Sequence, residues 1–326
     1  MKAVRYHEAG KPDVLQVDEI DRPQPEKGEI LVEVRAASIN PVDAKRRRAG
    51  AGRLPKTTGS DFAGVVASVG AGVERFSVGD RVFGTGLHAD RFQQGSFAEF
   101  VAVPQDIVAE LPDGVSFSAG AATALVGVTA WRALVDHARL QPAEACLVHG
   151  GSGGVGHVAV QLADAIGATV AATAGSAEKQ TYVRNAGADV VLSYNDESLS
   201  EMVVGALEGG ADVIVDHRVD EYLQFDVDVA AFGGRIVVYG GLEGALPDAR
   251  APRSKELSMY WMSMTNIANR EGTLAPISSI LSKIAILVEQ GDIAVEIADV
   301  YELEDAIEMH REVMNGDFIG KIVAEL

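Results

Sequence analysis

The pattern of hydrophobic and polar residues changes near residue 118. Before that point, Gly, Pro and Asp separate short β-like runs, which are AVRYHE, EILVEVRAAS, GVVASVG, DRVFGTG and FAEFVAVP. This spacing predicts a partly open β-barrel. From about residue 119, helical segments alternate with β-branched runs that predict five strands of a parallel sheet, namely ACLVH, TVAATA, DVVLS, DVIVD and RIVVYG.

Apolar residues at helical spacing predict the helices of this second region. One stripe ends before Gly167 and consists of Val155, Val158, Ala159, Leu162 and Ile166. Two more stripes cover residues 199–207 and 277–288, and each is followed by a glycine. A helix over 303–316 and a strand over 321–326 then end the chain, so the tail leaves the strand–helix alternation.

These patterns predict two domains. Residues 1–118 and 266–326 would form the barrel domain, and residues 119–265 a doubly wound α/β domain inserted into it. A length of 326 residues suits this division, because single hydrophobic cores rarely grow past about 250–300 residues.

Composition excludes several classes of protein. The content of 47% hydrophobic and 23% charged residues is typical of soluble globular proteins. The longest apolar runs are shorter than the roughly 20 residues of a membrane span, and the N-terminus lacks the apolar core of a secretory signal. A net charge of −19 argues against a nucleic-acid partner. The acidity has two interpretations, solubility and adaptation to high salt, where repulsion between carboxylates is screened.

The cysteine and histidine content argues against disulfides and metal sites. Cys146 is the only cysteine, which fits a reducing cytoplasm. The histidines show no paired metal-ligand spacing, so we expect surface or packing roles for His7, His88, His137, His149, His157, His217 and His310. Two of them flank the glycine-rich turn described next, His149 and His157.

A glycine-rich turn joins the first predicted strand of the α/β region to its helix. Residues Gly151–Gly156 read G-x-G-x-x-G between that strand and that helix. In such a unit the first glycine makes a tight turn, the second lets backbone approach a pyrophosphate, and the third lets helix and strand pack closely. The helix N-terminus adds free N–H groups and a partial positive charge. The turn therefore predicts a dinucleotide site.

The end of the next strand distinguishes the two nicotinamide cofactors. An NAD site carries Asp or Glu there, about 20 residues on, to bind the ribose 2′-hydroxyl. Here residues 172–176 read ATAGS, without an acid, and Lys179 follows at the start of a helix. A hydroxyl, a cation and a helix N-terminus would together bind a 2′-phosphate, which favours NADPH. The alternative is that Lys179 is a solvated lysine beside Glu178.

Further segments resemble one family, in order along the chain. They are SINPVDAKRRRAG, GSDFAGVVASVG, VGDRVFG, ALVGVTAWRAL, VHGGSGGVG, TAGSAEKQ, GADVVLSY, FGGRIVVYG and HREVMNGDFIGKIV. Together they resemble the medium-chain dehydrogenase/reductase superfamily, specifically its zinc-free quinone oxidoreductase and zeta-crystallin branch. The resemblance implies a Rossmann domain inserted in a GroES-like barrel domain. It also implies a homodimer formed through an edge strand near Met259–Met264.

The resemblance implies roles for individual residues. The pyrophosphate would lie against Ser152, Gly153, Gly154 and Val155. The adenosine and its 2′-phosphate would be surrounded by Gly175, Ser176, Lys179 and Tyr194. The cofactor's path at the sheet edge would be lined by Tyr239, Gly240 and Gly241. The backbone groups of Met262, Ser263 and Met264 would contact the nicotinamide, and Thr129 would approach it from the first interdomain helix. Asn40 would lie in the cleft, where its side-chain amide could form a hydrogen bond to the substrate or the cofactor.

The chain departs from the family's pattern in two places. Similar quinone reductases carry a tyrosine where this chain has Lys45, which would bring a cation near the nicotinamide to orient a carbonyl or bind an anion. Alternatively, Lys45–Arg48 is a solvated basic stretch. Trp261 and Met262 are bulkier than expected, which predicts a narrower pocket. The zinc-dependent relatives are excluded because they need several Cys or His ligands.

The expected reaction is metal-free hydride transfer from NADPH to a quinone or an α,β-unsaturated carbonyl. Solvent can protonate the resulting anion, so the protein must chiefly orient the acceptor and stabilise its oxyanion. Asn40 and Lys45 are the candidates for polarising the oxygen, and the sequence singles out no proton donor. An enoyl-thioester reductase and a non-catalytic NADPH-binding protein remain alternatives. A short-chain reductase is excluded, because the chain lacks Tyr-x-x-x-Lys and an N-terminal glycine turn.

Overall fold

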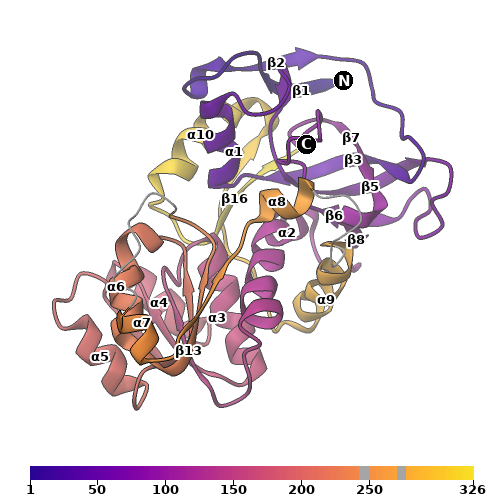
Figure 1. The fold of residues 1–326 in the computed structure, drawn as a ribbon. Coiled ribbons are helices and arrows are strands. Elements are labelled where there is room, and N and C mark those ends of the chain that lie inside the picture. Colours follow the sequence, from indigo (N-terminus) through magenta and orange to yellow (C-terminus); the bar gives the residue numbers. More distant parts are fainter. Residues whose placement is uncertain (242–249, 270–276) are drawn as a thin grey trace. The chain divides into compact units, whose positions relative to one another are not determined.

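A computed structural model describes residues 1–241, 250–269 and 277–326 (Figure 1). The chain divides into two compact units. The first, called the barrel unit here, comprises Met1–Val128, Met264–Gly291 and Val295–Leu326, and the second, the Rossmann unit, comprises Thr129–Ser263 and Asp292–Ala294. The first border lies ten residues beyond residue 118, inside one continuous helix, α2 (Phe117–Trp131).

The barrel unit contains two sheets. A three-stranded sheet has the order β2-β1-β4, and a seven-stranded sheet has the order β15-β16-β3-β5-β6-β8 with β7 beside β3. Strands β15 and β16 are parallel, and the other named pairs in these sheets are antiparallel. The strands are β1 (Lys2–Tyr6), β2 (Leu15–Glu19), β3 (Glu29–Ser38), β4 (Lys56–Thr57), β5 (Asp61–Val69), β6 (Arg81–Gly84), β7 (Phe100–Pro104), β8 (Val108–Glu110), β15 (Ile297–Glu302) and β16 (Lys321–Glu325).

The helices of the barrel unit come from both parts of the sequence. They are α1 (Pro41–Ala49), the first part of α2, α8 (Met264–Asn269), α9 (Ile277–Gln290) and α10 (Ala306–Asn315). The predicted helices over 277–288 and 303–316 are confirmed as α9 and α10, although residues Leu303–Asp305 form a short 3-10 turn before α10.

Helix α1 was not among the predicted elements. Its start is well marked, because Pro41 occupies the first turn and the Asp43 carboxylate accepts a hydrogen bond of 2.9 Å from the Asn40 backbone N–H. Gly50 ends it with a left-handed φ of 63°. Its basic residues are not uniformly solvated. Lys45 is exposed, whereas Arg47 is buried and donates to the Gly10 carbonyl.

The Rossmann unit is one six-stranded parallel sheet with the order β11-β10-β9-β12-β13-β14. Numbered from its first strand, this is the order 3-2-1-4-5-6 of dinucleotide-binding folds. The five predicted strands are confirmed, and the sixth is an edge strand. The strands are β9 (Ala145–Val148), β10 (Thr169–Thr173), β11 (Val190–Leu192), β12 (Ala211–Asp216), β13 (Ala230–Val238) and β14 (Ser258–Trp261).

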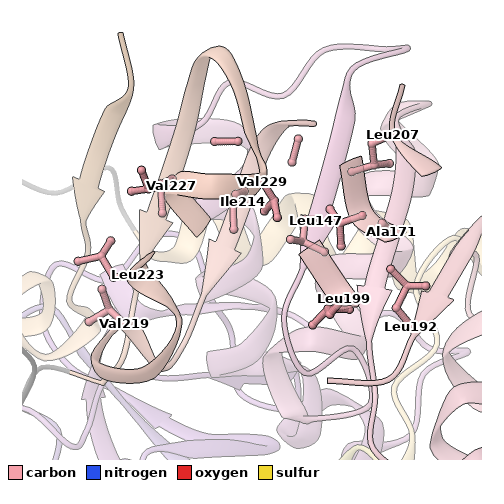
Figure 2. Close-up of a cluster of buried hydrophobic side chains, with 14 of the residues drawn as sticks. Leu147, Ala171, Leu192, Leu199, Leu207, Ile214, Val219, Leu223, Val227 and Val229 are labelled. Carbon is pink, nitrogen blue, oxygen red and sulfur yellow. The ribbon is translucent and has the colours of Figure 1, made fainter. Parts of the chain in front are cut away.

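The helices of this unit pack on the sheet, except the short last one, which lies against the helix before it. They are α3 (Gly154–Ile166), α4 (Ala177–Asn185), α5 (Leu199–Ala206), α6 (Val219–Val229) and α7 (Arg250–Ser254). Figure 2 shows one such core, in which Leu199 of α5 and Leu223 of α6 lie in the same cluster as Leu147 and Ile214 of the central strands. Side chains this buried each contribute about 1.5–3 kcal/mol to folding.

Among the described residues, one helix meets the length and mean hydropathy of a membrane span, although it contains no continuous apolar run of that length. It is Phe117–His137, which consists of α2 and a following π-helical turn. However, 72% of its most apolar window is buried inside the protein. Such burial is typical of a core helix, so the length and hydropathy of this helix are weak evidence that it spans a membrane.

Candidate functional site

The glycine-rich turn follows β9 directly and is tied to the neighbouring strand β10. The Gly150 N–H donates to Thr173 Oγ1 at 3.0 Å, and the Gly151 N–H donates to the Thr173 carbonyl at 2.8 Å. Gly150 adopts a left-handed φ of 63°. The tight turn is therefore made by Gly150, one residue before the first glycine of the predicted motif.

Two glycines of the motif leave room for different neighbours. A Cβ on Gly156 would lie 2.0 Å from the Gly150 carbonyl oxygen, so helix α3 can approach the turn only without a side chain there. A Cβ on Gly153 would meet only that same oxygen, at 3.3 Å. The space beside Gly153, at the N-terminus of α3, fits an approaching pyrophosphate.

The residues predicted around the 2′-phosphate lie close together at the end of β10. Ser176 caps α4, and its Oγ accepts a hydrogen bond of 3.2 Å from the Lys179 backbone N–H. A Cβ on Gly175 would lie 2.2 Å from the Tyr194 hydroxyl, so this ring covers the turn. The Ser176 hydroxyl hydrogen is left to donate, because its oxygen serves as the cap.

The remaining predicted cofactor residues follow β13 and β14, except Thr129, which is buried in α2. The Tyr239 backbone N–H donates to the Asp216 carbonyl at 2.9 Å, and the Met262 N–H donates to the Val238 carbonyl at 2.9 Å. Gly240 packs so closely on the His217 carbonyl that a Cβ would lie 2.4 Å from it, and Gly241 has a φ of 68°. Met262 is buried and Ser263 is exposed, while Met264 begins α8 in the barrel unit.

A buried group of ionisable residues beside the glycine turn was not predicted. We call it the His149 cluster, and it consists of His149, Asp216, His217 and Asp226. His149 Nε2 lies 2.8 Å from Asp226 Oδ1, and a Cβ on Gly150 would lie 2.9 Å from the His217 ring. The signal was present in the sequence, because His149 and Asp216 directly end parallel strands that meet at one sheet edge.

Burial favours the neutral form of every member of the His149 cluster. It raises the pKa of Asp226 to about 8, and burial together with the Asp226 charge raises the pKa of Asp216 to about 7. It lowers the pKa of His149 to about 4 and that of His217 to about 4. At the contact between His149 and Asp226, burial therefore favours a hydrogen bond between neutral groups over an ion pair.

The barrel unit holds a second buried polar group, which we call the Asp61 network. Asp61 Oδ2 accepts from Asn40 Nδ2 at 2.8 Å, and Asp61 Oδ1 accepts from Thr85 Oγ1 at 2.5 Å. Lys321 Nζ donates to Asn40 Oδ1 at 2.5 Å and to the Ile39 carbonyl at 2.6 Å. Burial raises the pKa of Asp61 and lowers that of Lys321, although each charge favours the other.

The network continues from Thr85 to a histidine. Ser60 Oγ lies 3.2 Å from Thr85 Oγ1 and 2.7 Å from His88 Nδ1, and it accepts from the Gly86 N–H at 3.1 Å. The members of the Asp61 network are therefore Lys321, Asn40, Asp61, Thr85, Ser60 and His88. Except for Asn40, none of them was predicted as a site residue.

The two predicted catalytic residues occupy different surroundings. Asn40 is 3% exposed, and both ends of its amide are engaged, by Asp61 and by Lys321. Its amide nitrogen has a second N–H that these bonds do not use. Lys45 is exposed on α1.

The side chains in the described part of the chain do not fit a zinc ion. Over the described ranges, no group of three or more His, Cys, Asp and Glu side chains could hold a metal ion. Cys146, the only cysteine of the sequence, is buried in β9, where burial raises its pKa to about 12. A thiol held in its neutral form is a poor metal ligand, because zinc binds the thiolate.

Comparisons with known proteins agree with this architecture. The description "Alcohol dehydrogenase GroES-like domain" matches residues 26–113, and "Zinc-binding dehydrogenase" matches residues 154–279. A quinone oxidoreductase of Mus musculus is 34% identical over 323 residues, which cover 97% of this chain and 95% of the relative. Among solved structures, an NAD-dependent alcohol dehydrogenase is 31% identical with a TM-score of 0.91. The Escherichia coli quinone oxidoreductase complexed with NADPH is 28% identical with a TM-score of 0.87, and both structures cover 100% of each chain.

Proposed function

Because the chain belongs to the medium-chain dehydrogenase/reductase superfamily, among relatives of quinone oxidoreductase, we propose that it is an NADPH-dependent reductase of quinones or α,β-unsaturated carbonyls. The observation that carries this proposal is the acid-free end of β10, where Ser176 caps α4 one turn before Lys179. An acid at this place would repel a 2′-phosphate, whereas a hydroxyl and a cation attract it.

The Rossmann unit would hold NADPH, which supplies hydride when bound. The pyrophosphate would lie at the N-terminus of α3, against Ser152–Val155, where Gly153 leaves space for it. The 2′-phosphate would bind Ser176 and Lys179 beside Tyr194. Tyr239–Gly241, Met262–Met264 and Thr129 would complete the contacts to the nicotinamide half.

The barrel unit would orient the acceptor and stabilise its developing oxyanion. Asn40 is held rigidly by Asp61 and Lys321, and its second amide N–H would donate to the acceptor oxygen. Lys45 would bind an anionic group of the acceptor from the exposed side of α1. The reaction would proceed without zinc, since the only thiol is buried in β9.

The Lys179→Ala substitution tests the cofactor assignment. We expect it to weaken NADPH binding about 10- to 100-fold, because a hydrogen bond to a charged group contributes about 1.5–3 kcal/mol, and to leave NADH binding within a few fold. Fluorescence titration with both cofactors measures this difference. Lys27→Ala removes an exposed lysine of the barrel unit and is the control for net charge. Equal losses for NADPH and NADH would contradict the 2′-phosphate site.

Steady-state assays separate the proposed reductase from its alternatives. Turnover of free quinones or enones with NADPH supports the proposal. Preference for acyl thioesters would instead indicate an enoyl-thioester reductase, and cofactor binding without turnover would indicate a binding protein.

The proposal includes a cytoplasmic homodimer that tolerates high salt. Strand β14 is the edge of the sheet that the described residues form, so its outer backbone groups would pair with a second copy. The net charge of −19 supports tolerance of molar salt, because salt screens repulsion between surface carboxylates. Size-exclusion chromatography tests whether the protein is a dimer. Activity assays in molar salt test whether the enzyme tolerates high salt.

A further inference from the structure

The Asp61 network is a continuous row of buried side chains with one unused end. Its members are at most 3% exposed, although two of them carry charge. The row runs from Lys321 through Asn40, Asp61, Thr85 and Ser60 to His88. At its far end, His88 Nε2 is buried and has no hydrogen-bond partner in the described part of the chain.

The hydrogens of this row can be assigned from donor and acceptor chemistry. An ammonium group only donates, so Asn40 Oδ1 must face Lys321 and the amide nitrogen must face Asp61. Thr85 has one hydroxyl hydrogen, which it donates to the Asp61 carboxylate. Thr85 Oγ1 therefore accepts the contact from Ser60, and the Ser60 hydrogen points toward Thr85.

The same reasoning fixes the tautomer of His88. Because the Ser60 hydrogen is used, Ser60 Oγ accepts from the Gly86 N–H and from His88 Nδ1. His88 then carries its hydrogen on Nδ1, and its Nε2 is a bare acceptor. Burial, with the charges of Arg46 and Lys56, lowers the pKa of His88 to about 3, so the ring is neutral. Every hydrogen bond between His88 and Asp61 thus points toward Asp61.

We propose that the Asp61 network stores one proton on Asp61 and releases it through His88 Nε2 to the anion formed when the acceptor is reduced. This inference rests on the proposed reductase function. It supplies the proton donor that the amino-acid pattern did not single out, and it assigns a role to Thr85, Ser60 and His88, which the proposed function leaves unused.

Loading and release reverse the direction of the same three hydrogen bonds between His88 and Asp61. A solvent proton binds His88 Nε2, the Nδ1 hydrogen passes to Ser60, the Ser60 hydrogen to Thr85, and the Thr85 hydrogen to Asp61 Oδ1. His88 now presents an Nε2–H donor. When that proton passes to the reduced acceptor, each hydrogen returns and Asp61 becomes a carboxylate again. The acceptor gains a hydride and one proton, so charge and atoms balance without another reactant.

The electrostatic surroundings suit a carboxyl group that gains and loses a proton. Burial raises the pKa of Asp61, and the Lys321 ammonium opposes this rise. Asp43, buried beside them, has its pKa raised to about 7 by burial and by the charge of Asp61. Arg46, Lys56 and Asp90 face the His88 end. Only hydrogens move in the transfer, so the packed side chains can stay in place.

Thr85→Val and Thr85→Ser form the decisive pair of variants. Valine keeps the shape but removes the hydroxyl link, whereas serine keeps the hydroxyl. With an enone as acceptor, we expect Thr85→Val to lower kcat about 100-fold, the lower range for general acid catalysis, and to abolish the solvent isotope effect. Thr85→Ser is expected to retain the wild-type kcat and the solvent isotope effect. NADPH affinity and the thermal midpoint, measured for each variant, report on folding.

Nitrogen-15 NMR of histidine-labelled protein without cofactor gives an independent measurement. We expect the His88 signal, assigned with His88→Asn, to show the Nδ1–H tautomer while Asp61 is a carboxylate and the Nε2–H tautomer once a lower pH protonates Asp61. Asp61→Asn is expected to abolish this change. A His88 tautomer that does not change with pH, or unchanged catalysis with its isotope effect in folded Thr85→Val, would overturn the proposal. Failure of the wild-type protein to reduce any quinone or enone would instead refute the proposed function, whatever the NMR result.

Discussion

The two units bury polar groups in different ways. The Asp61 network includes a cation, Lys321, and both oxygens of its central carboxylate accept hydrogen bonds from side chains. The His149 cluster includes no lysine or arginine, and the pKa values of its two acids are raised to about 7 and about 8. Neither Asp216 Oδ2 nor Asp226 Oδ2 accepts a hydrogen bond from a described donor. A proton shared by the two carboxyl groups would give both oxygens a partner.

The difference shows how a protein chooses the charge of a buried acid. Asp61 can be a carboxylate, because Lys321, Asn40 and Thr85 replace the water that it lost. Asp226 has no such cation, so it stays protonated and bonds to a neutral imidazole. The first arrangement is the one proposed to exchange a proton with the acceptor, whereas burial in the second favours protonated acids behind the glycine turn.

The largest expected effect comes from removing the cation of the Asp61 network. Lys321→Met would leave Asp61 and Asp43 buried without a positive partner, and we expect the unfolding free energy to fall by about 3–5 kcal/mol. Denaturant titration measures it. Lys27→Met, at an exposed lysine, is expected to change stability by less than about 0.5 kcal/mol. If Lys321→Met and Lys27→Met lowered the unfolding free energy by equally small amounts, Lys321 would not stabilise buried carboxylates. The Asp61 network would then not differ in charge from the His149 cluster.

A smaller effect is expected in the pH dependence of the His149 cluster. The folded pKa of Asp226, about 8, lies above its ordinary value of 3.8, so its contribution to stability is present at low pH and lost as pH rises toward 8. Asp226→Asn should remove this loss, up to about 1.4 kcal/mol per pH unit. His149, with a folded pKa of about 4 against 6.5, contributes stability that is lost only as pH falls below 6.5.

Unfolding measured between pH 6.5 and 8 therefore isolates the carboxyl groups. The matched control is Asp228→Asn, an exposed acid on the same helix. A wild-type slope identical to that of Asp226→Asn would show that Asp226 is ionised throughout this range.

The smallest effect concerns the ring that covers the His149 cluster. Tyr222 stacks on His149 with ring centroids 4.5 Å apart and planes 14° apart. Tyr222→Leu should cost about 0.5–1.5 kcal/mol, as aromatic pairs do, whereas Tyr222→Phe keeps the stack and should cost less. Thermal unfolding compares the two variants. If Tyr222→Phe lowered stability more than Tyr222→Leu, the Tyr222 hydroxyl rather than the ring stack would be the stabilising group.

Five strands of the Rossmann unit and its helices α3 and α5 could be predicted because their signals are local, whereas α6 and α7 were not predicted. Each strand is a short β-branched run, and each glycine stop follows a helical stripe, as Gly167 follows Ile166. Helix α1 was missed although its capping residues Asn40 and Asp43 were visible, because its basic face hid the usual apolar stripe. The sixth strand, β14, appeared in the sequence only through the family resemblance.

The Asp61 network could not be predicted, because its bonds depend on strand register. Asn40 and Lys321 are 281 residues apart. They meet because Ser38 pairs with Asp61 on one side and with Val323 on the other, which brings the ends of β3, β5 and β16 together. No local pattern of residues encodes such a pairing, whereas the acid-free end of β10 could be read directly.

The return of the chain to the barrel unit has a consequence for biosynthesis. Residues 129–263 of the Rossmann unit are contiguous and leave the ribosome before the barrel unit is complete. Strand β16, which carries Lys321, is made after every other described strand of the barrel unit. Asp43 and Asp61 therefore await their cation until β16 has been made, and only then can the barrel close around them. A product terminated before β16 would lack this cation and would be a natural target for cellular quality control.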